Sequence, residues 1–200
     1  SNIAYYDNKL VNKPWGYEYL IYRNKSSLAV WFLYLNYKKM TSLHCHPNKK
    51  TGFILLNGKV KIQLGLWKSE SKIYQSPNKL MIRTGLFHQT TALSKKGIYA
   101  LEFETPVDKN DLVRFKDKYG RKYKPYEGVK NFSKIPDSFI KIPNNIRKFP
   151  KEYRIEKVKI KIEEHKNFKK INKYKMNTIH AILDGNIINK QNKKILSYGD

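Results

Sequence analysis

The chain has 200 residues, of which 40% are hydrophobic and 14% aromatic, so it is long and apolar enough to bury a sizeable core. Its single cysteine, Cys45, excludes an intrachain disulfide framework. The longest apolar run, from Leu28 to Leu35, is far shorter than the about 20 residues that a membrane-spanning helix needs. The N-terminus shows no secretory leader pattern, and these features together predict a cytoplasmic protein with no membrane partner.

The formal net charge is +25, because 41 Lys and Arg face only 16 Asp and Glu. Such a positive field attracts anions, including nucleic acids, phosphorylated metabolites and acidic membranes. Lysine far outnumbers arginine, however, and Asn, Ile and Tyr are abundant, a mixture that is typical of an AT-rich genome with lysines on solvated faces. No long unbroken basic block marks a nucleic-acid-binding tail, so nucleic acid is the disfavoured partner.

Short strands dominate the first half of the chain. In order, strand composition covers residues 29–35, 52–56, 59–63, 72–75, 79–82 and 98–103. The Asn57-Gly58 pair predicts a two-residue hairpin between the second and third of these. No stretch between residues 15 and 105 shows helical periodicity. Many short, evenly spaced strands favour an all-β sandwich or a barrel-like jelly roll.

The second half is less regular. Five prolines between residues 106 and 150 predict a linker over residues 122–152, and short helical turns are expected around residues 111–118 and 134–139. Residues 154–162 alternate polar and apolar side chains, as a strand does. Residues 180–187 repeat the pattern of residues 53–60, which indicates a partial second unit over residues 153–200, unless both segments are merely common turn sequences.

Three of the five histidines form one pattern. His44 and His46 lie on the same face of a short strand, because alternate residues of a strand share a face. His88 follows the strand at residues 79–82, after a turn at Gly85. Three neutral imidazoles suit a divalent transition metal (Zn, Mn, Ni or Fe), whereas the plainer alternative is a set of hydrogen-bonded histidines at a barrel rim.

The pattern resembles the cupin superfamily, whose fold is a jelly-roll β-barrel with a metal in its mouth. His44-Cys45-His46, followed by Thr51 and Gly58, resembles the first cupin motif, and Gly85-Leu-Phe-His88 resembles the second. The glutamate ligand of the first motif is replaced by Thr51, and the proline of the second by Arg83. The resemblance therefore implies a metal held by His44, His46 and His88, with open positions for water or substrate.

A closer resemblance lies in the flanking segments. Residues 13–18, Lys-Pro-Trp-Gly-Tyr-Glu, and residues 101–121, which end in Tyr-Gly-Arg, are similar to the cupin domain of type II phosphomannose isomerases, often fused to mannose-1-phosphate guanylyltransferase. The ligands of that family are Gln, His, Glu and His, and they fall here on His44, His46, Thr51 and His88. The resemblance implies a cupin domain over residues 1–121, and the prolines and the internal repeat predict the linker over 122–152 and a partial second cupin-like unit over 153–200.

The resemblance implies a metal-dependent enzyme, an isomerase or epimerase of surface polysaccharide biosynthesis that acts on a phosphorylated sugar or a nucleotide sugar, in a homodimer. A metal polarises the sugar oxygens while a base moves a proton between adjacent carbons. The catalytic candidates are Glu102, Glu104 and Arg114, and the basic candidates for the substrate anion are Lys49, Lys50, Arg83 and Arg121.

Three alternatives stay open at this point. A site of three histidines also suits an iron dioxygenase, in which oxygen uses the open positions. A cupin that has lost its glutamate suits a non-catalytic sugar- or anion-binding module. A nucleic-acid-binding protein would show a steep dependence of affinity on salt. Arg114 and Arg121 also have a structural interpretation, in which they form ion pairs with Asp111 and Asp117 and hold the tail of the domain in place.

Overall fold

The computed structural model describes residues 3–25, 27–124, 129–143, 151–167, 171 and 177–200. The strands are β1 (Lys9–Lys13), β2 (Gly16–Arg23), β3 (Ala29–Leu35), β4 (Leu43–Cys45), β5 (Lys50–Leu55), β6 (Lys59–Leu64), β7 (Ser71–Gln75), β8 (Asn78–Ile82), β9 (His88–Ala92), β10 (Ile98–Thr105), β11 (Val113–Lys116), β12 (Phe132–Lys134), β13 (Lys151–Ile155), β14 (Val158–Ile162), β15 (Asn186–Ile188) and β16 (Lys194–Ser197). Short 3-10 turns are the only helical elements in these ranges, and none of them is long and apolar enough to cross a membrane.

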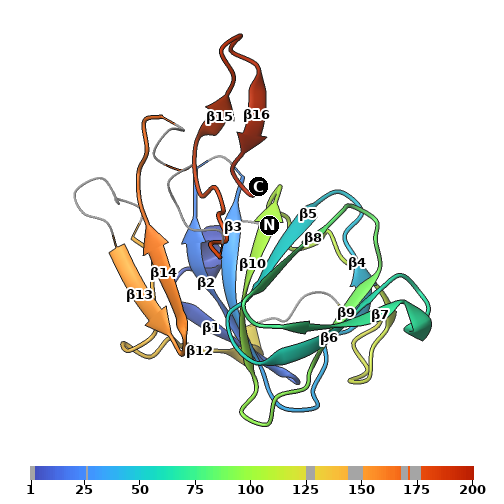
Figure 1. Cartoon of the computed structure of the whole chain (residues 1–200). Helices are drawn as coiled ribbons and strands as arrows, with labels where there is room; N and C mark the ends of the chain where they lie inside the picture. Colours follow the sequence, from blue (N-terminus) through green and yellow to red (C-terminus); the bar gives the residue numbers. More distant parts are fainter. Residues whose placement is uncertain (1–2, 26, 125–128, 144–150, 168–170, 172–176) are drawn as a thin grey trace.

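Two antiparallel sheets form the body of the fold (Figure 1). The larger has seven strands in the order β12-β1-β2-β3-β10-β5-β8, and the smaller has five in the order β11-β4-β9-β6-β7. Strands that are distant in sequence are neighbours in both sheets, as in a jelly roll. The predicted all-β jelly roll is therefore confirmed as the fold class.

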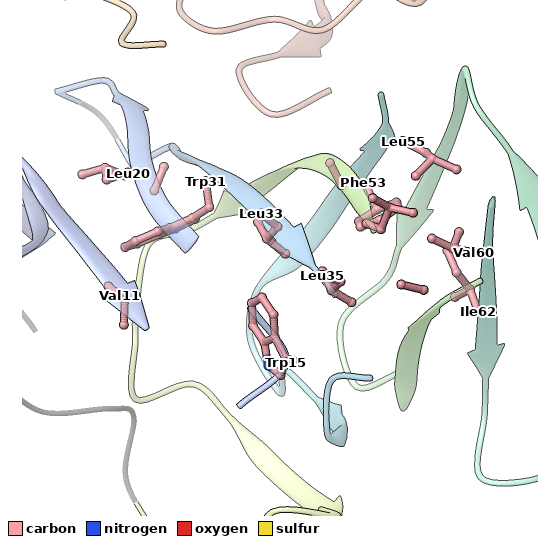
Figure 2. Packing of buried hydrophobic residues seen from close by; sticks show 14 of the residues in the cluster. Val11, Trp15, Leu20, Trp31, Leu33, Leu35, Phe53, Leu55, Val60 and Ile62 are labelled. Atoms are coloured by element: carbon pink, nitrogen blue, oxygen red, sulfur yellow. The ribbon is translucent and has the colours of Figure 1, made fainter. Parts of the chain in front are cut away.

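The main core lies between the two sheets. Figure 2 shows its side chains, which come from β3 and β5 on one side and from β6 on the other. They include Trp31, Leu33 and Phe53, and across from them Val60 and Ile62, all of which are almost fully buried. Inward positions of both sheets thus share one apolar layer, which explains the alternating pattern of β6.

The large sheet is also covered on its outer face. Val30 and Phe32, which alternate with the inward residues of β3, belong to a second buried cluster. Side chains from beyond residue 130 complete that cluster, among them Ile135, Ile142 and Ile162. Because both faces of β3 are buried, its sequence is apolar throughout instead of alternating.

The range expected to be a linker also contributes to the large sheet. β12 pairs with β1, and the N–H of Ile142 donates to the carbonyl of Ile21 at 3.1 Å. Within that range, residues 125–128 and 144–150 lie outside the described residues. The region expected to begin a second unit contains two separate two-stranded sheets, β13-β14 and β15-β16, and the second cupin-like unit stays a prediction.

Three local predictions were wrong. The Asn57-Gly58 turn does not close a hairpin, because β5 pairs with β8 and β10 whereas β6 pairs with β7 and β9 in the other sheet. The turn carries the chain from one sheet to the other, held by the Asn57 side chain, which accepts the N–H of Tyr99. Gly58 supplies the positive φ of 72° that such a turn needs.

The other two errors concern the second half. Residues 111–118 contain the strand β11 in place of a helical turn, because Val113 and Arg114 pair with β4. Residues 154–162 are not one strand: the chain reverses at Glu156, whose φ is 51°, and β13 pairs with β14. A hairpin formed from one alternating run preserves the alternation, so the sequence pattern does not reveal the turn.

Candidate metal centre

The structure brings His44, His46 and His88 together. His44 and His88 are direct partners in the antiparallel pairing of β4 with β9, and His46 lies one residue after the end of β4. The ring centroids of His44 and His88 are 4.3 Å apart, and those of His44 and His46 are 5.0 Å apart. One ring nitrogen from each histidine lies within 4.8 Å of the others, which is close enough for one metal ion to contact all three.

A turn between β8 and β9 links the segment before His88 to the segment that carries His46. The N–H of Gly85 donates to the carbonyl of His46 at 2.8 Å, which joins the loop before His88 to the loop after β4. Gly85 has a φ of 73°, a conformation that glycine adopts without strain. The spacing of Gly85 and His88 in the sequence therefore reflects a turn that holds two of the histidines in register.

Each imidazole is oriented through its Nδ1 atom. Nδ1 of His44 lies 2.8 Å from the carbonyl of Ser42, that of His46 lies 2.6 Å from the carbonyl of Asp111, and that of His88 lies 3.0 Å from the carbonyl of Leu86. A carbonyl only accepts hydrogen bonds, so these contacts assign the proton to Nδ1 and leave the lone pair on Nε2. Metal-binding histidines are commonly fixed in this way.

A metal ion fits these residues. The Nε2 atom of His46 is buried and has no hydrogen-bond partner among the described residues, which is the state expected of a ligand atom. Burial, reinforced by the charge of Lys49, lowers the pKa of His46 to about 3. Burial lowers the pKa of His88 to about 4 and that of His44 well below its ordinary value. All three rings are therefore neutral at physiological pH, the form that binds metal.

Thr51 occupies the position at which the cupin motif has a glutamate. It lies on β5 opposite Glu104 of β10 and is 1% exposed. Its Oγ1 atom has no hydrogen-bond partner among the described residues. A threonine hydroxyl carries no negative charge and binds a divalent ion more weakly than a carboxylate does. The described part of the chain thus offers three imidazole ligands at this centre.

A pocket beside the histidines contains a buried charge network. Both His44 and His46 line it, and so does Glu104, whose carboxylate lies 2.9 Å from the Nζ of Lys49 and 3.3 Å from the Nζ of Lys109. Burial alone would raise the pKa of Glu104, but the two ammonium groups hold it well below its usual range. Glu104 is therefore a permanently charged group.

Aromatic and acidic neighbours complete this network. The Nε1–H of Trp31 donates to the second carboxylate oxygen of Glu104 at 3.1 Å, and the Nζ of Lys109 lies 3.4 Å from the centre of the Trp31 ring. Lys13 pairs with Glu18 at 3.4 Å. The network thus satisfies its buried charges mutually, as buried ionic groups require.

Glu102 differs from Glu104 although both line the pocket from the same face of β10. In the described part of the chain, Glu102 forms no hydrogen bond or ion pair. Burial, together with the negative charges of Glu104 and Glu18, raises its pKa to about 7. Glu102 is consequently the carboxyl group of the pocket that gains and loses a proton near neutral pH.

The predicted basic residues of the site, the catalytic candidate Arg114 and the four substrate-binding candidates, separate into two groups. Lys49, Arg114 and Arg121 line the pocket. Lys50 is not among the lining residues, and its ammonium group pairs with the side chain of Asp200. Arg83 is also absent from the lining and is exposed to solvent. The adjacent residues Lys49 and Lys50 thus enter different environments, Lys49 just before β5 and Lys50 at its first position.

The two arginines of the tail make structural contacts as well. Nη1 of Arg114 donates to the carbonyls of Arg121 at 3.2 Å and Lys124 at 2.6 Å. Nη2 of Arg121 lies 2.7 Å from Asp117, which agrees with the structural interpretation of that pair. Asp111 instead accepts hydrogen bonds from the main chain of Asn48 and Lys49. Both arginines hold the tail beside the pocket that they line.

Sequence reasoning missed four charged residues of the site: Lys13, Glu18, Lys109 and Asp111. Lys13 and Glu18 flank the Pro-Trp-Gly segment that was noted for its resemblance, so that resemblance was a usable signal. Lys109 is 5% exposed, although lysine is rarely buried unless it is paired. In a chain with 41 basic residues, no pattern distinguishes this lysine from those on the surface.

Comparison with known proteins finds distant structural similarities. No protein-family model matches the chain, and no curated protein matches its sequence. Among solved structures, an oxalate decarboxylase from Lactobacillus farciminis in complex with formate has a TM-score of 0.47 and 16% identity over 55% of this chain and 34% of its own. The capsular polysaccharide assembling protein CapF from Staphylococcus aureus has a TM-score of 0.48 and 16% identity over 54% of this chain and 31% of its own.

A third similar structure is the cupin domain of Cnp3 from Schizosaccharomyces pombe, with a TM-score of 0.42 and 9% identity over 46% of this chain and 64% of its own. This chain thus spans about a third of the oxalate decarboxylase and CapF chains. At such low identity the similarity concerns the fold alone. The chain is an all-β protein of jelly-roll architecture with a three-histidine group that can hold a metal ion.

Proposed function

We propose that this protein is a metal-dependent isomerase or epimerase that acts on a phosphorylated sugar or a nucleotide sugar in surface polysaccharide biosynthesis. The observation that carries the proposal is that His44 and His46 of the three-histidine group line one pocket together with Glu102, whose pKa is raised to about 7. A carboxyl group with that pKa is suited to exchange a proton at neutral pH. The sugar substrate and the pathway rest on the resemblance of residues 13–121 to phosphomannose isomerases.

The proposed roles follow from the contacts of each residue. His44, His46 and His88 hold the metal through Nε2, and the bound ion supplies Lewis-acid polarisation of substrate oxygens. Glu102 removes the proton from the hydroxyl-bearing carbon beside the sugar carbonyl and returns it to the carbonyl carbon, while the hydroxyl proton passes to the former carbonyl oxygen. Glu104 takes no part in proton transfer, because Lys49 and Lys109 keep it ionised.

The charge of the pocket supports an anionic substrate. Five basic residues and three glutamates are found among its lining residues, and Glu102 is partly protonated near pH 7. The excess of positive charge attracts a phosphate group into the pocket. Arg121 and Arg114 are the guanidinium groups of this lining, and a guanidinium binds phosphate in a bidentate manner. We assign the phosphate to these two arginines in preference to Lys50 and Arg83.

A three-histidine iron dioxygenase remains the second candidate, since Thr51 leaves the centre without a carboxylate ligand. Glu102 separates the two candidates, because proton transfer between carbons requires a base whereas the reaction with oxygen does not depend on this group. The dioxygenase would retain activity in a Glu102→Gln variant, and the isomerase would lose it.

The test begins with elemental mass spectrometry of the purified protein and of a His46→Ala variant. We expect stoichiometric Zn, Mn, Ni or Fe in the parent and none in the variant. The loaded protein is then incubated with a panel of sugar phosphates and nucleotide sugars in heavy water, and deuterium incorporation into the substrate carbon is followed by NMR. Exchange in the parent and its loss in metal-loaded Glu102→Gln would support the proposal.

Other outcomes identify the alternatives. Iron together with substrate-dependent oxygen consumption would favour the dioxygenase. Saturable sugar-phosphate binding without exchange would favour a non-catalytic module. A protein that takes up no metal after reconstitution would refute both enzymes. Cytoplasmic localisation and a homodimer stay predictions from the sequence, and light scattering of the purified protein tests the second of them.

A further inference from the structure

The loop that carries His46 is held by one acidic residue from a distant part of the chain. The carboxylate of Asp111, which is 6% exposed, accepts the main-chain N–H of Lys49 at 2.9 Å and that of Asn48 at 3.1 Å. It also accepts the side-chain amide of Asn48 at 2.9 Å. The Asp111 side chain thus caps the two residues that follow the His46-Pro47 turn.

The main chain of Asp111 contacts the same loop a second time. Its carbonyl accepts the Nδ1–H of His46 at 2.6 Å. The Nζ of Lys49 donates to the carbonyl of Asp108 at 3.2 Å. The loop after His46 is therefore joined to both ends of the segment of residues 108–111. Movement of Asp111 away from the loop would therefore remove the Nδ1 acceptor of His46 at the same time.

His46 differs in this respect from the other two histidines. The carbonyls that orient His44 and His88 belong to Ser42 and Leu86, each two residues away along the chain. The carbonyl that orients His46 lies 65 residues away in the sequence. Local backbone geometry thus fixes two of the rings, whereas the third depends on a tertiary contact.

We propose that Asp111 is a positioning residue of the metal centre: its carboxylate fixes the loop at Asn48 and Lys49, so that its carbonyl holds His46 as the Nδ1–H tautomer with Nε2 directed at the metal. The inference rests on metal binding in the proposed function. Partners of this kind around metal-binding histidines typically change metal affinity by about 10–100-fold when they are altered.

The Asp111→Asn substitution removes part of this contact with little change in volume. An amide retains one accepting oxygen, but its NH₂ group faces an N–H of the loop and repels it. Asp108→Asn is a matched control, because it makes the same charge change in the same segment. The Asp108 carboxylate accepts a hydrogen bond from the N–H of Asn110 within its own turn, at 2.9 Å. Asn48→Ala is a milder variant that removes only the side-chain donor.

The experiment measures the Zn²⁺ dissociation constant of each variant by competition with a chromophoric chelator. Long-range ¹H–¹⁵N NMR of the metal-free protein reports the tautomer of His46 independently. We expect the dissociation constant of Asp111→Asn to rise by about 10-fold or more. Its His46 ring should become a mixture of tautomers, while Asp108→Asn matches the parent in both measurements.

The outcomes distinguish this inference from the proposed function. A folded Asp111→Asn variant with the parent's zinc affinity and an unchanged His46 tautomer would overturn the inference. If Asp111→Asn does not fold, the Asn48→Ala variant decides. A smaller rise in its Zn²⁺ dissociation constant would support the inference, and an unchanged dissociation constant would overturn it. A parent protein that binds no metal would refute the proposed function, and the tautomer measurement alone would then decide the role of Asp111.

Discussion

The ammonium group of Lys49 lies 2.9 Å from the carboxylate of Glu104, and both side chains are almost completely buried. Lys109 contacts the same carboxylate at 3.3 Å, so Glu104 pairs with two buried ammonium groups. Removal of one partner from a buried ionic group leaves uncompensated charge and costs about 3–5 kcal/mol. We expect Glu104→Gln to lower the free energy of unfolding by that amount, measured by urea denaturation.

The control for this prediction is an exposed ion pair of similar geometry. Glu152 lies 2.9 Å from Lys159, and both side chains are about half exposed. Exposed pairs contribute about 0–1 kcal/mol, so Glu152→Gln should change the free energy of unfolding little. Equal effects of the two substitutions would show that the buried network does not stabilise the fold.

Glu102 gives a pH dependence of activity. The proposed base must be ionised to accept a proton, and its pKa is raised to about 7. We therefore expect kcat to rise with pH through about 7. A Glu102→Gln variant should lose about 10²–10⁴-fold in kcat while it keeps its metal and a similar KM. A rate profile that is flat between pH 6 and pH 8, both values being about one unit from that pKa, would exclude Glu102 as the base.

The same carboxyl group gives a pH dependence of stability. The folded-state pKa of Glu102 is raised from 4.5 to about 7, so ionisation is harder in the folded than in the unfolded chain. The resulting penalty is absent below about pH 4.5, grows as the pH rises to about 7 and is constant above that value. Glu102→Gln should thus stabilise the protein at pH 8 relative to the parent and leave it unchanged at about pH 4.

The measurement is urea denaturation of the metal-free parent and variant at both pH values. At pH 8 we expect Glu102→Gln to raise the free energy of unfolding, whereas Glu104→Gln should lower it, although only one residue separates the two glutamates on the same strand. Destabilisation by Glu102→Gln at pH 8 would show that the folded protein does not raise the pKa of Glu102.

The sequence predicted the jelly roll and the meeting of the three histidines because both depend on short-range patterns. β3 shows a continuous apolar run, and His44 on β4 is followed two residues later by His46, just past the end of that strand. The turn at Asn57-Gly58 was misassigned because a short-range pattern alone was used to predict strand pairing. A two-residue turn has the same local sequence whether its strands pair or enter different sheets, and only the tertiary pairing decides.

The polar part of the pocket was harder to predict. Lys49 and Lys50 are adjacent and chemically identical, yet one enters the pocket and the other pairs with Asp200. Lys49 lies immediately before β5 and Lys50 begins it, and the boundaries of strands are the least certain features of a sequence pattern. The role of Asp111 depends on a contact across 65 positions, for which the chain carries no local signal.

The Pro-Trp-Gly segment gives a prediction about backbone packing. Gly16 has a φ of 150°, and a Cβ atom at this position would lie 1.9 Å from the carbonyl oxygen of Tyr34 on β3. We expect Gly16→Ala to cost at least about 3 kcal/mol, because main-chain atoms must move to accept a methyl group. Gly85→Ala is the control: its φ is 73°, but nothing lies within 4 Å of the added atom. Strain alone should then cost about 1–2 kcal/mol.

Thermal and urea denaturation of both variants test this difference. If Gly16→Ala were no more destabilising than Gly85→Ala, the close approach of β2 to β3 at this glycine would not be a requirement of the fold.

Metal binding itself should stabilise the folded chain. The three histidines come from β4, its following loop and β9, so the complete ligand set exists only in the folded state. A ligand that binds only the folded protein adds about 2.7 kcal/mol when its free concentration is 100 times its dissociation constant. We expect Zn²⁺ to raise the free energy of unfolding of the parent by about that amount and to leave His46→Ala unchanged.

His165 provides the control for this last prediction. It lies outside the cluster and contacts Glu163 at 3.1 Å, so His165→Ala should keep the full response to Zn²⁺. Dialysis against a chelator should return the parent to its metal-free stability, because the effect arises from mass action. An equal response to Zn²⁺ in the parent and in His46→Ala would mean that the ion binds elsewhere on the chain, and the three histidines would then be packed side chains without a metal.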